Sequence, residues 1–139
     1  MKPYLLLLAA LLAITPAAAP AADPCALAVL NPVESVLLLG DFQLRVNARV
    51  DTGADLSSLD STLAQQAGLD QPVVREITVR NANGVTRRKV VRLKFMLRGQ
   101  VRQAEFSLIK RDGLAHPVLL GRRTLQGFLV DPSGKCEGC

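Results

Sequence analysis

Much of the chain after residue 35 alternates apolar and polar residues with a period of two, which is typical of half-buried β-strands. Three pairs of apolar or alternating runs are separated by residues that favour turns, so three hairpins are predicted. Their strands are residues 36–39 with 42–50, residues 73–80 with 85–91, and residues 91–97 with 101–109. Short apolar runs at 117–121 and 128–130 complete the pattern. The sequence therefore predicts a mostly β fold.

Only two short helices fit between these runs. Asp60 and Ser61 are candidate N-cap residues, residues 62–67 are compatible with a helix, and Gly68 follows where a C-terminal glycine is favoured. Residues 122–126 are long enough for one further helical turn.

The first 22 residues are typical of a secretory signal peptide. Met1-Lys2 precedes an apolar run too short for a membrane span, and small residues then offer several cleavage sites. The alternatives are an uncleaved anchor and, less favoured because Pro24 precedes Cys25, a lipoprotein. We expect a periplasmic or secreted protein with a signal peptide (1–22), an N-terminal segment (23–35), one domain (36–132) and a Cys-containing tail (133–139).

The three cysteines lie near the two ends of the mature chain. In an oxidising compartment Cys25 is expected to pair with Cys136 or Cys139, with the third thiol free or intermolecular. The C-x-x-C spacing of Cys136 and Cys139 lacks a second ligand pair, which disfavours zinc binding and redox chemistry.

Positive charge is concentrated in the second half of the chain. Residues 71–130 contain thirteen Lys or Arg residues against three acids, Glu76, Glu105 and Asp112. Such a field attracts acidic partners or simply solvates strand faces. Because aromatic residues are few in this half and a signal peptide is predicted, nucleic-acid binding has little support.

One Asp-Thr-Gly, Asp51-Thr52-Gly53, follows the second predicted strand and is continued by Ala54. As a plain turn, the aspartate and glycine need no catalytic role. Leu120 and Gly121, about 65 residues later, are suited to support this loop from beneath, since glycine permits close backbone approach. About 115 residues are too few for two lobes, so a site that needs two lobes requires two chains.

These stretches resemble retropepsin-type aspartic proteases. The nearer resemblance, carried by "ARVDTGADLSSLDS" and by "LIKRDGLAHPVLLGRRTLQGFLVDP", is to a bacterial retropepsin-like family associated with ATP-grasp peptide ligases and historically labelled an ATP-dependent zinc protease. The resemblance covers residues 36–132. It implies a small closed barrel with one or two short helices, a homodimer, and peptide-bond hydrolysis.

The resemblance also implies roles for individual residues. Asp51 of each subunit would form a catalytic dyad, Thr52 would hydrogen-bond across it, and Gly53 would present its backbone to the dyad or substrate. Asp55 and Arg122 would form an ion pair near the dimer seam, with an ordinary surface pair as the alternative. The tip of a flap over the substrate would consist of Asn81, Ala82, Asn83 and Gly84, which are equally well explained as a hairpin turn.

No cofactor or metal is expected. His116 is the single histidine, and its place before Pro117 favours a structural role at a strand entrance. We expect an exported homodimeric aspartic endopeptidase that acts on peptides, with acidic peptides favoured by the basic half. The alternatives are a catalytically inactive peptide-binding module of the cell envelope and a structural module locked by the terminal cysteines. The endopeptidase hypothesis requires Asp51 for cleavage, whereas neither alternative gives Asp51 a catalytic role.

Overall fold

The computed structural model describes residues 27–82 and 84–135. The predicted signal peptide, the three cysteines and Asn83 lie outside the described residues, so these predictions are not tested. Within the described ranges, no helix is long and apolar enough to cross a membrane. The strands are β1 (Ala28–Leu30), β2 (Val33–Leu39), β3 (Gln43–Val50), β4 (Ser57–Asp60), β5 (Val73–Asn81), β6 (Gly84–Leu97), β7 (Gln100–Ile109), β8 (Val118–Leu120) and β9 (Phe128–Val130). The helices are α1 (Ser61–Gln66) and α2 (Arg122–Leu125).

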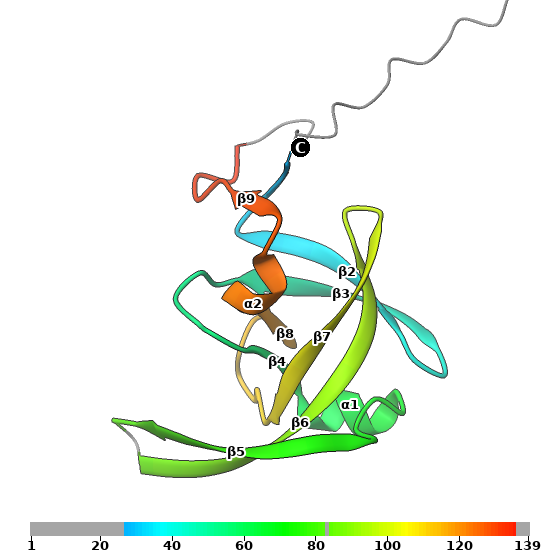
Figure 1. Ribbon diagram of the computed structural model, residues 1–139, viewed down its shortest axis with the longest axis vertical. Helices are drawn as coiled ribbons and strands as arrows, with labels where there is room; N and C mark the ends of the chain where they lie inside the picture. Colours follow the sequence, from blue (N-terminus) through cyan, green and yellow to red (C-terminus); the bar gives the residue numbers. More distant parts are fainter. Residues whose placement is uncertain (1–26, 83, 136–139) are drawn as a thin grey trace, which may run out of the picture.

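Strands β2 to β8 make one sheet that closes on itself. Its order is β2-β3-β8-β4-β7-β6-β5, and β2 also pairs with β6, so six strands form a barrel with β5 outside it (Figure 1). Because the sheet closes, none of the six barrel strands is an unpaired edge strand. The prediction of a small, mostly β closed barrel with short helices is confirmed.

A long strand links the barrel to a projecting hairpin. The two predicted runs that meet at Val91 are halves of β6, which is continuous because no turn residue interrupts it. Its first half pairs with β5 in the hairpin that extends along the lower edge of Figure 1, and its second half pairs with β7 and β2. Arg98 and Gly99 then connect β6 to β7, both with positive φ, as in the two-residue turns that suit hairpins.

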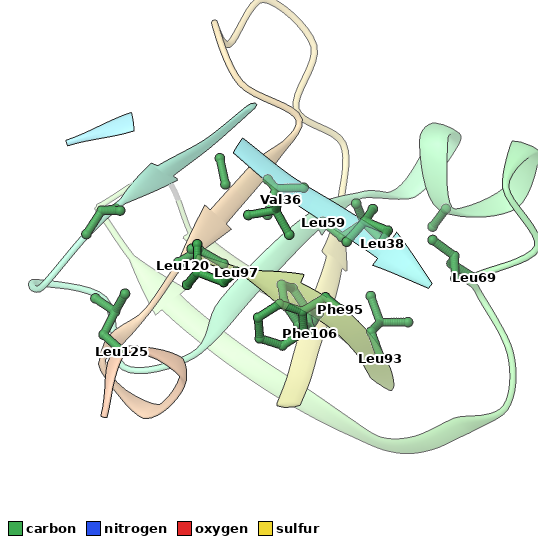
Figure 2. Packing of buried hydrophobic residues seen from close by; sticks show 14 of the residues in the cluster. Val36, Leu38, Leu59, Leu69, Leu93, Phe95, Leu97, Phe106, Leu120 and Leu125 are labelled. Atoms are coloured by element: carbon green, nitrogen blue, oxygen red, sulfur yellow. The ribbon is translucent and has the colours of Figure 1, made fainter. Parts of the chain in front are cut away.

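The hydrophobic core fills the inside of the barrel (Figure 2). Alternate residues of the strands point inward, as Val36 and Leu38 do on β2, both with no exposed surface. Phe95 of β6 and Phe106 of β7 pack edge to face at its centre, with ring centroids 5.7 Å apart and planes at 83°.

The local signals for α1 also agree with the structure. Oδ1 of Asp60 accepts a hydrogen bond from the backbone N–H of Leu63 at 2.9 Å, as an N-cap residue does. Gly68 has a φ of +66°, the left-handed conformation expected just after a helix. Apart from the barrel, β1 and β9 form a short parallel pair that joins the two ends of the described chain.

A buried ion pair fixes the β6–β7 turn to the start of β2. Arg98 donates to Oε1 of Glu34 at 2.6 Å, and the same oxygen accepts the backbone N–H of Asn31 at 2.7 Å. The Glu34 side chain is only 7 % exposed and that of Arg98 is 24 % exposed, so water screens this pair less than a surface pair.

We therefore expect Glu34→Ala to lower the free energy of unfolding by about 2–3 kcal/mol, because two donors lose a shared charged acceptor. Urea denaturation measures the change. Glu76→Ala is the matched control: Glu76 lies exposed on β5, and its loss should alter stability by less than about 0.5 kcal/mol. Equal effects of the two substitutions would contradict a stabilising role for the buried pair.

Candidate active site

The Asp51 loop begins where β3 ends and folds around its own carboxylate. Oδ1 of Asp51 accepts the backbone N–H of Gly53 at 2.9 Å and that of Ala54 at 3.3 Å. Its other carboxylate oxygen, Oδ2, has no hydrogen-bond partner within the part of the chain that the structure describes. Thr52 and Gly53 are exposed and Asp51 is half-buried. The loop thus orients the carboxylate of Asp51 through one oxygen and leaves the other without a partner among the described residues.

Strand β8 and its following residues hold this loop from beneath. The backbone N–H of Asp51 donates to the carbonyl of Leu120 at 2.9 Å, and that of Arg122 donates to the carbonyl of Ala54 at 2.8 Å. Between them, Gly121 approaches the loop so closely that a Cβ there would lie 2.7 Å from the carbonyl carbon of Leu56. Glycine is therefore required by contact at this position, since its φ of −90° is open to any residue.

Two buried hydroxyl groups, whose role the sequence analysis missed, complete this support. Ser57 Oγ accepts the backbone N–H of Gly121 at 2.9 Å and lies 2.6 Å from Oγ1 of Thr124 on α2. Both side chains are buried, at 0 % and 3 % exposure. The sequence marks Ser57 only as the first of two adjacent serines that follow the Asp-Thr-Gly motif, and both are buried in the structure. The partner Thr124 had no such signal.

Asp55 lies between two arginines at the end of the same loop. Arg122, its predicted partner, is 3.7 Å away, whereas Arg123 is closer at 2.8 Å. All three side chains are more than half exposed, so each contact contributes less than about 1 kcal/mol.

A cleft of about 560 Å³ opens beside the loop, between the β5–β6 hairpin and the barrel. Ala54, Asp55 and Leu56 form its loop side, and the hairpin contributes Ile77 and Val79. The hairpin therefore covers this cleft with side chains from the middle of its strands. The described residues of the predicted flap tip do not line it: Ala82 and Gly84 are exposed, and Gly84 has a φ of +120°.

Arg111 is a further cleft residue that the sequence analysis did not single out. Its backbone N–H donates to Oδ2 of Asp60, its Nε to the carbonyl of His116 at 2.9 Å, and its Nη1 to Ser58 Oγ at 2.9 Å. Burial lowers the pKa of the Arg111 guanidinium from its ordinary value, while Asp60 raises it and Arg88 lowers it. His116 takes part through its backbone carbonyl. Among the described residues, no three His, Cys, Asp or Glu side chains form a cluster that could hold a metal ion.

A single Asp-Thr-Gly loop on a small closed barrel defines the retropepsin-like class. The sequence profile of the RimB-like family, described as retropepsin-like aspartic endopeptidase RimB, matches residues 60–136, more than half of the chain. The protein therefore belongs to the RimB-like family. The matched range begins after the Asp-Thr-Gly motif, so the assignment rests on the barrel residues that follow it.

Solved structures agree with this fold. A Legionella pneumophila protein of unknown function is 26 % identical, with a TM-score of 0.57 over 76 % of this chain and 94 % of the other. The simian foamy virus protease (17 % identity, TM-score 0.51, 67 % of this chain and 90 % of the other) shares the fold. So does the EIAV protease in complex with an inhibitor (19 % identity, TM-score 0.52, 68 % and 85 %).

A curated relative is much longer than this protein. A probable alpha-L-glutamate ligase from Parasynechococcus marenigrum is 37 % identical over 67 residues, which are 47 % of this chain and 14 % of the ligase. The chain thus spans a small part of that relative's length.

Gly121→Ala should displace the Asp51 loop, because the added Cβ would meet the backbone of Leu56 and Ala54 and no flexible side chain could yield. We expect the free energy of unfolding to fall by about 1–3 kcal/mol beyond that of the control, measured by thermal or urea denaturation. Gly113→Ala is that control: its Cβ would meet nothing within 4 Å, and its φ of +74° alone costs about 1 kcal/mol. A Gly121→Ala protein as stable as the control would contradict the close support of the loop.

The carboxyl group of Asp60 should make part of the free energy of unfolding depend on pH. Hydrogen bonds from the backbone N–H groups of Leu63 and Arg111 lower the pKa of Asp60 below its ordinary value of 3.8. Its stabilising contribution is therefore complete above about pH 4 and is lost as the pH falls through the lowered value. In Asp60→Asn, which keeps an N-capping oxygen, the deficit in unfolding free energy relative to wild type should shrink from pH 6 towards pH 2.

Urea denaturation across this pH range measures the difference between the two proteins. Asp112→Asn, in an exposed turn, is the matched control and should change the free energy of unfolding at pH 6 by less than about 0.5 kcal/mol. A deficit in Asp60→Asn that stays constant or grows on acidification would show that the Asp60 carboxylate is not stabilised by folding.

Proposed function

We propose that this protein is an exported aspartic endopeptidase that hydrolyses peptide bonds as a homodimer. The observation that carries the proposal is the Asp51 loop: a half-buried carboxylate is held through one oxygen by backbone N–H groups, and the residues that follow it, Ala54 to Leu56, line a cleft. Family membership supports the same activity. Residues 1–22, with their signal-peptide pattern, support export.

The requirement for two chains follows from the chemistry of amide hydrolysis by carboxyl groups. One ionised carboxylate takes a proton from water, and the water oxygen attacks the carbonyl carbon of the substrate. A second, protonated carboxyl donates its proton to the carbonyl oxygen; the tetrahedral intermediate then collapses and the amine leaves with a proton. Two carboxyl groups about 3 Å apart supply both states, because their repulsion prevents joint ionisation.

One chain supplies only one Asp-Thr-Gly, so the second carboxyl would be Asp51 of another copy. The exposure of Thr52 and Gly53 leaves the loop open to such a contact. In this dimer Thr52 would hydrogen-bond between the two loops, and Gly53 would offer its backbone to the dyad or the substrate. The exposed ion pairs of Asp55 with Arg122 and Arg123 would lie near the seam.

Acidic peptides are the proposed substrate class. Four arginines line the cleft against one acid, Asp55, so the cleft favours negative charge. The description of one relative, a probable alpha-L-glutamate ligase, is consistent with this choice.

An inactive peptide-binding module is the second candidate. It is favoured by one observation: the family match begins at residue 60 and leaves the Asp-Thr-Gly outside. The same cleft would then bind acidic peptides without cleaving them.

Asp51→Asn distinguishes the two candidates. If Asp51 acts in proton transfer, this substitution should lower kcat for cleavage of an oligoglutamate peptide by at least about 100-fold. Cleavage is followed by mass spectrometry of the mature protein and its variant. Asp41→Asn, in the exposed β2–β3 turn, is the matched control and should retain wild-type activity. Equal cleavage by wild type and Asp51→Asn would exclude the proposed peptidase.

Mixing the subunits tests whether the site is shared. When wild type is mixed with excess Asp51→Asn and the subunits are allowed to exchange, activity per wild-type chain should fall, because most wild-type chains then have a partner without the second carboxyl. Excess Asp41→Asn should cause no such fall. An activity per wild-type chain that is unchanged by Asp51→Asn would mean that each chain has a complete site of its own.

A further inference from the structure

The four arginines of the cleft are of two kinds. Arg75 is paired with Glu105 at 2.7 Å, and Arg123 is paired with Asp55 at 2.8 Å. The other two, Arg88 and Arg111, form no ion pair within 4 Å through their guanidinium nitrogens in residues 27–82 and 84–135. The excess positive charge of the cleft is therefore localised at these two side chains.

Arg111 is held firmly on the barrel side of the cleft. Its guanidinium donates from Nε to the carbonyl of His116 and from Nη1 to the hydroxyl of Ser58, and its backbone is fixed to Asp60. Both side-chain acceptors are uncharged. Asp60, bound to the Arg111 backbone, raises the pKa of the Arg111 guanidinium without forming an ion pair with it. Arg111 is thus a positioned cation with donors left for an anion, as a preorganised anion-binding group would be.

Arg88 faces the same cleft from the hairpin. It lies on β6 opposite Ile77 of β5, whose side chain also lines the cleft. Its Nε is buried and makes no hydrogen bond to any described residue. An unsatisfied buried donor is costly, and here it belongs to a group whose charge already acts on Arg111.

We propose that Arg88 and Arg111 together form a carboxylate-binding subsite, in which a substrate carboxylate bridges the β5–β6 hairpin and the barrel. A carboxylate has two oxygens and can accept from both guanidinium groups at once, which would satisfy the free donors and remove the repulsion between the two charges. This inference rests on the proposed function for its occupant, a peptide. The carboxylate comes either from an Asp or Glu side chain or from a free C-terminus.

In this subsite the substrate carboxylate would contact residues on both sides of the cleft. Arg88 lies on β6 in the projecting hairpin and Arg111 in the loop after β7, so an anion bound by both would contact the two sides of the cleft. A peptide with an uncharged amide at the same position would leave the two cations facing each other. The protein would then prefer a carboxylate at one particular position of the substrate, and it would have no general preference for acidic peptides.

The test compares peptides that differ by one carboxylate. A peptide that wild type cleaves is prepared with Glu or Gln at each position in turn, and each form is made with a free or an amidated C-terminus. We expect kcat/KM to fall at least about tenfold when the critical carboxylate becomes an amide. The peptide set shows whether that carboxylate is a side chain or the C-terminus.

Arg88→Gln should abolish this discrimination and bring the ratio of kcat/KM for the acid and amide peptides close to one. Arg88→Lys should restore only part of it, because lysine keeps the charge but loses the planar guanidinium. Arg87→Gln is the matched control: it removes the same charge from the neighbouring residue of β6, which points to the opposite face and does not line the cleft. It should retain the wild-type ratio. Arg111→Gln should act as Arg88→Gln does if thermal denaturation shows that it folds.

A binding measurement separates failure of the subsite from failure of the peptidase. The Asp51→Asn protein, with and without Arg88→Gln, is titrated with fluorescein-labelled acid and amide peptides, and anisotropy reports Kd. Discrimination that depends on Arg88 supports the subsite even if no variant cleaves any peptide. Normal cleavage with a ratio unaffected by Arg88→Gln, or reduced as much by Arg87→Gln, overturns the subsite and leaves the peptidase standing. Absence of any acid preference in both measurements also overturns it.

Discussion

The close contact between two backbone segments, the Asp51 loop and the residues around Gly121, is the constraint on which the site depends. Hydrogen bonds from Asp51 to Leu120 and from Arg122 to Ala54 join the segments, and no side chain fits between them. Such an approach is stable only when its polar groups are satisfied. Ser57 does this for the Gly121 N–H, and in doing so connects the loop to α2 through Thr124. The orientation of one carboxylate thus depends on β3, β4, β8 and α2 together.

The strand pattern and the turn residues were sufficient to predict the fold class and most elements, because each signal acts over a few residues. Alternation predicted β3, the second half of β6 and β7, Asp60 and Gly68 predicted the ends of α1, and glycine at 121 indicated a close backbone approach. The pairing of β5 with β6 was predicted from the turn residues between them, whereas the irregular register between Val73 and Arg75 was not. These features can be predicted from a few neighbouring residues, together with the expectation that one side of each strand is buried.

Other features depend on contacts between distant residues, which a single sequence does not reveal. The parallel pairing of β3 with β8 and of β4 with β7 places Leu120 beneath Asp51 and brings Ser58 close to Arg111. Thr124 and Arg111 had no distinguishing pattern of their own, because a threonine in a short helix and an arginine in a basic segment are common. Only the closed barrel shows that one is buried against Ser57 and that the other lies in the cleft.

The basic residues of the second half of the chain also have different roles in the sequence pattern and in the folded structure. From the sequence, its arginines are a uniform excess of charge that either attracts acidic partners or keeps strand faces in water. In the folded barrel some of these arginines form ion pairs with acidic residues. Arg75 and Arg92 both contact Glu105 and lower its pKa, and Arg98 contacts Glu34. These arginines need no external ligand to account for their positions. Arg88 and Arg111 are different because the folded chain brings both to one cleft and neither forms an ion pair with a described residue. A net charge alone does not distinguish a solvated face from a binding site, whereas the pairing of each charge in the folded chain does.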